Sequence, residues 1–221
     1  LQLVMLVLIA LYVISGFRTI DEGETGVSTI CGAVMDEEGL APGLQISWPS
    51  PIGGFEVFKA ENRHVAIGGV FMPRIDPNIS RDQRISKARS KDGLKPGRDG
   101  SLITSDGDLA HLELAATWEI VDPVKYADTI PDSEGNILVK LALERAAVHI
   151  VSSMTLESLL DEPLEHLRNV VKIATQKELD TFKCGIRIAE VSLPFEPEPP
   201  LFIQQSYSEF DSARINAETE V

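Results

Sequence analysis

The chain has 221 residues, and its 34 acidic and 20 basic residues give it a net charge of −14. This balance argues against a nucleic-acid partner, because that binding depends on neutralising phosphates with Lys and Arg. It also means that contact with an anionic lipid surface has to come from apolar side chains and not from charge.

The front of the chain is apolar, since only Gln2 is clearly polar between Leu1 and Ile14, whereas Asp21 to Glu24 open a polar body. We interpret residues 1–16 as a transmembrane helix, and because a span needs about 20 apolar residues we expect it to continue upstream. A cleaved signal peptide and a buried core helix are the alternatives. The expected anchor side chains are Leu3, Val4, Leu6, Val7, Leu8, Ile9, Leu11, Tyr12, Val13 and Ile14.

Basic residues near this segment indicate its orientation. Arg18 is the only one close downstream, and the next is Lys59. Cytoplasmic flanks of membrane helices are normally rich in Lys and Arg. We therefore expect the body of the protein on the non-cytoplasmic side.

Residues 17–72 read as a small antiparallel β-rich subdomain. Short apolar runs alternate with turn residues such as Ala41-Pro42-Gly43. The expected strands are Thr25–Ile30, Gln45–Trp48, Phe55–Lys59 and Arg63–Val70.

Residues 73–100 differ in kind, because they carry eight of the twenty Lys and Arg residues, three prolines and few apolar side chains. This composition predicts a long basic, flexible insertion. A solvated loop explains it most simply. The alternative is a docking loop for an acidic neighbour, such as another copy of this acidic chain.

Residues 101–193 read as a compact α/β subdomain. Apolar and polar residues alternate from Leu109 to Ile120, which predicts one strand with a dry face and with His111 and Glu113 on its outer face. Asp122-Pro123 has the chemistry of a helix start, and Thr155 can begin another short helix. Gly185 then marks a turn before a last strand through Val191.

Two longer helices are expected between these markers. Asp132 and Ser133 can cap the first, and Pro163–Asp180 forms the second. The apolar stripe expected on the first helix, interrupted only by Arg145, consists of Ile137, Leu138, Leu141, Ala142 and Val148. The stripe of the second consists of Leu164, Leu167, Val170, Val171, Ala174 and Leu179.

The end of the chain combines a stiff Pro-rich hinge at residues 194–200 with the start of a coiled-coil helix at residues 201–221. One face of that helix carries apolar residues, which we expect to mediate oligomerisation. These are Ile203, Tyr207, Phe210 and Ala217. The fold class expected for the whole chain is α+β.

The sequence contains no pattern that supports catalysis. Its four histidines lack the spacing of a metal site, and neither a serine-nucleophile turn nor a phosphate-binding glycine loop occurs. His111 and Glu113 are a possible pair, but two polar residues on a wet strand face are common. Cys31 and Cys184 form no metal or redox motif and read as small buried side chains, with their pairing left open. We expect no catalytic, metal-binding or cofactor-binding residues.

Several segments, in order, resemble HflK-type members of the stomatin/prohibitin/flotillin/HflK-HflC (SPFH) superfamily. Residues 17–27 after the apolar helix are similar to the family's opening, and Ala41-Pro42-Gly43-Leu44 with Trp48-Pro49 is similar to its "PGLH…PWP" segment. The most specific match joins residues 102–107 to the strand ending near Trp118 and to residues 122–126. Pro199-Pro200 with Phe210, Ala213 and Arg214 resembles the entry into the coiled coil. Cys31, where the family commonly has phenylalanine, and the long insertion depart from the pattern.

The resemblance implies a non-enzymatic scaffold of the bacterial inner membrane, with most of the chain in the periplasm. It implies large rings or cages built with an HflC-like partner that enclose the membrane AAA protease FtsH and limit its access to substrates. The main alternative is a stomatin- or flotillin-like organiser of membrane microdomains without a protease partner. A membrane-anchored hydrolase and a secreted binding domain are weaker alternatives.

Overall fold

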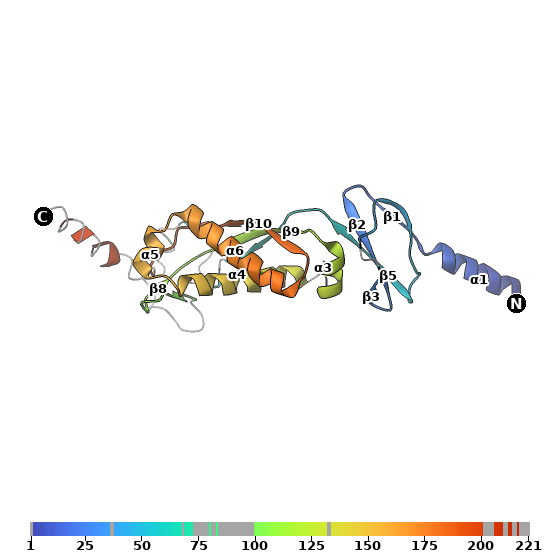
Figure 1. Ribbon diagram of the computed structural model, residues 1–221, viewed down its shortest axis with the longest axis horizontal. Helices are drawn as coiled ribbons and strands as arrows, with labels where there is room; N and C mark the ends of the chain where they lie inside the picture. The colour runs from blue at the N-terminus through green and yellow to red at the C-terminus, as the bar shows by residue number, and fades with distance from the viewer. Residues whose placement is uncertain are drawn as a thin grey trace. The chain divides into compact units, whose positions relative to one another are not determined.

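The computed structural model confirms an α+β protein (Figure 1). The structure describes residues 2–35, 38–67, 69–72, 80, 83, 100–131, 134–200, 206–209, 212, 213 and 216. Its elements in chain order are α1 (Gln2–Ile14), β1 (Phe17–Ile20), β2 (Glu24–Ile30), β3 (Ala33–Val34), β4 (Gly43–Ile46), β5 (Gly53–Lys59), β6 (Arg63–Ala66), β7 (Leu102–Ile103), β8 (Leu109–Ala110), β9 (Ala115–Ile120), α3 (Pro123–Thr129), α4 (Gly135–Val151), α5 (Leu156–Asp161), α6 (Leu164–Phe182) and β10 (Ile186–Ser192).

The chain forms two compact units, each assembled from three stretches of sequence. The first unit consists of Leu1–His64, Thr117–Val139 and Gln176–Ala189. The second consists of Val65–Ala116, Lys140–Thr175 and Glu190–Val221. Most of the residues expected to fold as a β-rich subdomain therefore pack with parts of β9, α3 and β10 in the first unit.

The first unit is built on an antiparallel sheet in the order β3-β2-β5. Helix α3 packs against β2 and β3, and Val27 of β2 is fully buried. In Figure 1 these strands lie beside β1. The predicted strands at 25–30 and 55–59 are confirmed, whereas the strand expected over Arg63–Val70 ends at Ala66.

A cluster of aromatic side chains forms the core of the first unit. The ring of Tyr126 meets that of Phe58 edge to face, with the centroids 5.6 Å apart, and it lies 6.3 Å from the ring of Trp118. The guanidinium of Arg63 sits 5.3 Å from the Trp118 centroid, close enough for a cation–π contact. The indole N–H of Trp118 donates to the side-chain oxygen of Asn136, which satisfies its one polar group.

The helix starts and the turn predicted from local chemistry are confirmed. Asp122 accepts a hydrogen bond from the backbone N–H of Lys125, and Pro123 occupies the first turn of α3. Thr155 caps α5 in the same way through the N–H of Ser158. Gly185 adopts a positive φ of 68°, which glycine reaches without strain. The caps expected at residues 132 and 133 lie outside the described residues.

The single strand expected from Leu109 to Ile120 is wrong. The structure divides this stretch into β8 and β9, and residues 112–114 between them are not in a strand. His111, expected on a wet face, is fully buried, and its ring Nε2 lies 3.0 Å from the hydroxyl oxygen of Ser101. Its backbone exchanges hydrogen bonds of 2.8 and 3.1 Å with Glu198. Pairing with this distant segment, which local alternation cannot reveal, accounts for the burial.

The stripe expected to bury α4 is also wrong in part. Its members Ile137, Leu141 and Val148 are about half exposed, at 56%, 56% and 48%. Of the expected stripe only Ala142 is buried, and the face that packs inward also carries Val139, Leu143, Ala146, Ala147, Ile150 and Val151. Because α4 has apolar side chains around most of its circumference, periodicity alone could not select the buried face.

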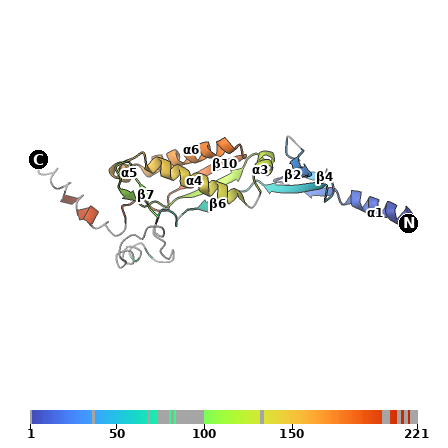
Figure 2. The ribbon, with the colours of Figure 1, turned by 90° about the horizontal axis from the view of Figure 1, so that it is seen from below.

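In the second unit, the turn between β7 and β8 lies against the start of α5 (Figure 2). The carboxylate of Asp106 accepts hydrogen bonds from the hydroxyl of Thr104 and from the backbone N–H of Leu156, the first residue of α5. The Thr104 hydroxyl, and with it the N–H of Leu156, holds the pKa of Asp106 below its ordinary value, and only partial desolvation opposes this. Asp106 thus links two segments of the second unit.

We expect Asp106 to make the fold sensitive to acid. A lowered pKa means that the folded state binds the proton less tightly, so the stabilisation is present above the ordinary carboxyl pKa and is lost as the pH falls through the folded-state value. Asp106→Asn should therefore lower the thermal midpoint of unfolding at neutral pH. The further decrease of that midpoint on acidification should be smaller than in the unaltered chain. Circular dichroism between about pH 7 and pH 3 measures both. Asp108→Asn is the control, because it removes a charge from the same turn and keeps the acceptor of Thr104 and Leu156. Equal acid sensitivity of Asp106→Asn and the unaltered chain would contradict the assignment.

Candidate functional site

Helix α1 is an apolar helix without a buried side chain. It begins at Gln2 and ends at Ile14, so it includes all the residues expected to form the anchor. Each of them is exposed in the structure: Leu3, Val4, Leu6, Val7, Leu8, Ile9, Leu11, Tyr12, Val13 and Ile14. Within the part of the chain that the structure describes, none of the helices has both the length and the apolar character needed to cross a bilayer.

The end of α1 is held directly against the segment that follows β4. The backbone N–H of Ser47 donates to the carbonyl of Gly16 over 2.9 Å, and the hydroxyl of Tyr12 donates to the carbonyl of Pro49 over 3.1 Å. A Cβ atom at position 16 would come within 2.4 Å of the Ser47 carbonyl oxygen, so this close approach requires glycine. The helix therefore joins the first unit at a fixed junction.

Strands β1 and β4 form an antiparallel ribbon at this junction, with Phe17 opposite Ile46 and Thr19 opposite Leu44. Directly opposed residues point to the same side of a ribbon. The side that contains Ile20 faces the core, where Ile20 is buried. The other side is exposed and mainly apolar, since Phe17, Leu44 and Ile46 are 45%, 67% and 74% exposed.

Two further large apolar side chains are exposed in the segment after β4, namely Trp48 at 58% and Ile52 at 43%. We refer to Phe17, Leu44, Ile46, Trp48 and Ile52 as the apolar collar. The solvent-facing side of an antiparallel ribbon usually carries polar residues. Exposed groups of large apolar side chains mark contact surfaces. The collar and α1 together form the candidate functional surface.

Sequence reasoning missed the collar, although its signal was present. Leu44, Ile46 and Trp48 alternate with Gln45 and Ser47, which is the pattern of a strand with one apolar face. Without the pairing to β1, nothing distinguishes an apolar face that points to the core from one that points outward.

The residues considered for chemistry are dispersed in the structure. His64 lies near Thr117 in the first unit, while His111 contacts Ser101 and His166 contacts Glu162 in the second. No group of three or more potential metal ligands occurs among the described residues. Cys31 is exposed and Cys184 buried, and both are free thiols, so the expectation of burial is wrong for Cys31. Burial raises the pKa of the Cys184 thiol.

Tyr207 is the only one of the expected oligomerisation residues that falls within the described residues, where it is half-buried in a helical segment at residues 206–209. Ile203, Phe210 and Ala217 lie outside the described residues. Their role in oligomerisation therefore stays a prediction.

Comparison with protein families defines the class of the molecule. The model of the SPFH domain / Band 7 family matches residues 18–221, so the chain belongs to this family. The match begins in β1 and includes the second unit and all of the first unit except residues 1–17.

Individual relatives carry the name HflK. The chain is 26% identical over 212 residues to "Protein HflK" of Buchnera aphidicola subsp. Schizaphis graminum, covering 92% of this chain and 41% of the relative. It is 22% identical over 189 residues to "Modulator of FtsH protease HflK" of Escherichia coli K12, covering 80% of this chain and 42% of the relative. The chain thus spans about two fifths of the length of these curated relatives.

The two tryptophans of the chain provide a direct measurement of the collar, because Trp48 is exposed there and Trp118 is fully buried. In liposomes that contain brominated zwitterionic lipid, we expect quenching of Trp48 emission in a Trp118→Phe variant. The matched control is Trp48→Phe, whose remaining Trp118 should keep its emission. Leu44→Asp with Ile46→Asp should reduce the quenching, because a charged side chain at the surface opposes contact with hydrocarbon. Unquenched Trp48 in protein that has bound to the liposomes would rule out lipid contact by the collar.

Proposed function

We propose that this chain is a membrane-anchored SPFH scaffold that modulates a membrane AAA protease of the FtsH type. One observation carries the proposal, namely that an entirely exposed apolar helix is fixed to an exposed apolar collar. Family membership and the printed name of the Escherichia coli relative, a modulator of FtsH protease, support it. In this proposal the role is regulatory and not catalytic.

In this proposal α1 lies in the hydrocarbon layer as part of a single-pass anchor, and the collar rests in the interfacial region of the same membrane. Trp48 suits that position, because tryptophan is enriched at membrane–water interfaces. The near absence of Lys and Arg after α1, where Arg18 stands alone before Lys59, favours the periplasmic side for the body. The corresponding location is the bacterial inner membrane.

Anchoring promotes assembly for a physical reason. Confinement to a plane raises the effective concentration of neighbouring subunits, so weak lateral contacts suffice to associate them. Contacts between different surfaces of successive subunits close into rings when the rotation permits. We propose a ring or cage built with an HflC-like paralogue, to which the coiled-coil helix predicted at residues 201–221 contributes through Ile203, Tyr207, Phe210 and Ala217.

A second candidate function is the organisation of membrane microdomains without a protease partner. The collar favours it, because a surface that contacts lipid headgroups and acyl chains can respond to lipid composition by itself. Both candidates share the anchor and the assembly and differ only in the partner.

Purification in mild detergent distinguishes the two candidates. We expect an AAA protease of the FtsH type to co-purify in a fixed ratio with the tagged chain from its native membrane. A matched sample that carries Leu44→Asp and Ile46→Asp tests whether membrane contact supports the association. Recovery of large assemblies that contain only SPFH proteins would favour the microdomain organiser.

The predicted coiled-coil face is tested by replacing Tyr207 and Phe210 with Asp. Charged residues in an apolar helix seam oppose its burial, so we expect smaller assemblies on native gels with an unchanged circular dichroism spectrum. Ser206→Asp with Ser208→Asp is the control, because it adds the same charge to neighbouring exposed positions. Intact assemblies of the Tyr207/Phe210 variant would refute the role of this face.

A further inference from the structure

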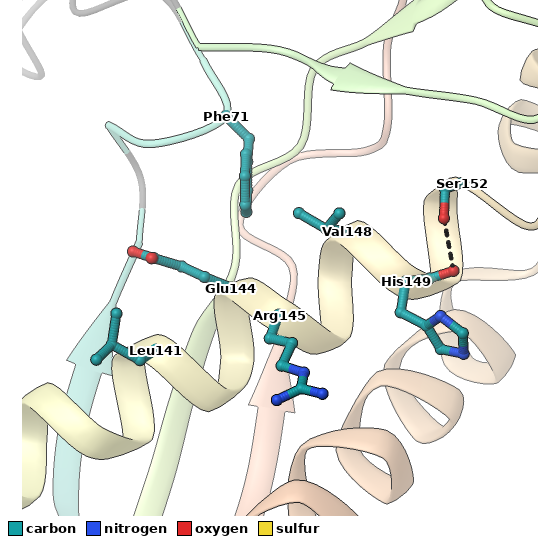
Figure 3. Close-up of a pocket in the computed structure, with 7 residues that line it drawn as sticks. All are labelled: Phe71, Leu141, Glu144, Arg145, Val148, His149 and Ser152. Carbon is teal, nitrogen blue, oxygen red and sulfur yellow. Dashed lines mark hydrogen bonds between the residues drawn. The ribbon is translucent and has the colours of Figure 1, made fainter.

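Two exposed features of the described chain have no part in the proposed function. One is an open hollow of about 490 Å³ beside α4, and Figure 3 shows that Leu141 and Val148 line it together with Glu144 and Arg145. This lining combines apolar side chains with charges of both signs, so it does not select one class of ligand. The other feature is the outer edge of β5, where backbone groups set the spacing and direction of any partner.

The register of the β2–β5 pair shows which backbone groups of β5 point outward. Along an antiparallel pair, residues that bond to the partner strand alternate with residues whose N–H and C=O groups point away from it. Just past the end of the pair, the N–H of Ala60 donates to the carbonyl of Gly23. In the same register, the even-numbered residues of β5 bond to β2. The backbone groups of Phe55, Val57 and Lys59 therefore point to the outer edge.

The outer edge of β5 is open. β5 has seven residues and is the last strand of the sheet β3-β2-β5. In the described part of the chain, the outward groups of Phe55, Val57 and Lys59 form no hydrogen bonds. Val57 is 40% exposed, and the Lys59 ammonium lies 3.5 Å from the carboxylate of Glu24 on β2, so neither side chain covers the edge.

The chain covers the edge of another strand with a side chain. β10 is also seven residues long and lies at the edge of its sheet. The side-chain amide of Gln176 donates to the carbonyl of Ile186 over 3.1 Å and accepts from the N–H of Ile188 over 2.8 Å. Proteins commonly protect strand edges, because an open edge is a template for another chain. Within the described residues β5 has no such cover, which marks its outer edge as a binding surface.

A second copy of this chain does not fit the edge by pairing β5 with β5. The Gly53 end of β5 lies at the junction with α1, because the carbonyl of Pro49 accepts from the N–H of Gly53 and from the hydroxyl of Tyr12. The other end lies at α3, where the ring of Phe58 meets Tyr126. An antiparallel two-fold pair would therefore place the two α1 helices at opposite ends, where they could not enter one bilayer. This step rests on the proposed membrane anchor.

We propose that the outer edge of β5 binds an extended segment of another membrane-associated polypeptide as an additional antiparallel strand. Directly opposed residues of such a pair point to the same face. Residues opposite Phe55 and Val57 lie beside apolar side chains, so apolar residues suit these positions. The residue between them lies opposite Glu56, which is exposed, so Lys or Arg suits that position. The partner is thus a strand in which apolar and basic residues alternate.

A matched pair of N-methylated peptides tests the backbone pairing. The probe is a fluorescent peptide of about seven residues, with apolar residues alternating with lysine, added to the full-length chain in zwitterionic liposomes. N-methyl groups at the apolar positions remove the N–H groups that face β5, so fluorescence anisotropy should show an affinity lower by about tenfold or more. N-methyl groups at the lysine positions point away from β5 and should change little. Equal affinity of the two methylated peptides, or no binding of the unmethylated one, overturns the inference.

Val57→Pro tests the same pairing from the protein side. It removes one outward N–H and leaves the bonds to β2 intact, because proline is tolerated on an edge strand. We expect the affinity for the unmethylated peptide to fall about tenfold. Val57→Ala is the matched control, since it shortens the side chain and keeps the N–H. If Val57→Pro also lowers the thermal midpoint of unfolding, the methylated peptides decide alone.

A charge exchange tests the chemistry of the partner. Glu56→Lys should weaken binding of the lysine peptide and strengthen binding of a peptide with glutamate at the same positions, because like charges directly opposite each other repel. Equal binding of both peptides by both proteins would contradict the assigned register. Dimers that form without peptide and that Val57→Pro abolishes would assign the edge to a second copy and overturn the choice of partner.

These outcomes are separate from those of the proposed function. A co-purifying protease without peptide binding would retain the scaffold and exclude the β5 edge as a binding surface. Peptide binding without any protease partner would retain the edge and favour the microdomain organiser.

Discussion

The hydrogen bond from the Ser47 N–H to the Gly16 carbonyl fixes where α1 joins the strands of the first unit, and the exposed apolar surface depends on that geometry. A helix with no polar face is stable in an apolar environment and not in water. The elements at the end of α1 are therefore adjacent to the same apolar environment. Those elements are β1 and β4, whose outward side is apolar. The junction thus places the apolar collar beside the apolar helix, where both can contact one apolar environment.

Backbone chemistry limits how deeply the collar can enter a membrane. A two-stranded ribbon has two edges at which backbone N–H and C=O groups are unpaired. Burying each such group in hydrocarbon without a hydrogen bond costs on the order of several kcal/mol. Helix α1 satisfies its backbone internally, but the β1–β4 ribbon does not. Hydrocarbon therefore suits α1, and the interfacial region, where water still reaches the strand edges, suits the collar.

Local chemistry made some elements predictable, and long-range pairing made others unpredictable. Asp122 and Thr155 determine helix starts through hydrogen bonds to residues three positions away, so the sequence suffices to place them. His111 is buried because its backbone pairs with Glu198, which lies 87 residues further along the chain. The alternation of apolar and polar residues around position 111 cannot predict a partner so distant in sequence. The collar was missed for the same reason, since only the β1–β4 register distinguishes its outward side. Helix α4 has apolar residues on both faces, so tertiary packing and not the sequence pattern determines which face is buried.

The composition of the collar indicates which kind of surface it can contact. The collar consists only of apolar side chains, and Arg18 lies in register with Gln45 on the other side of the ribbon. Placing an arginine in hydrocarbon costs about 2.5–3.5 kcal/mol even at a helix position open to water defects, so a charge on the outward side of the ribbon would oppose contact with lipid. Lipid therefore suits the collar in the proposed function, because its outward side chains bring no charge into the membrane.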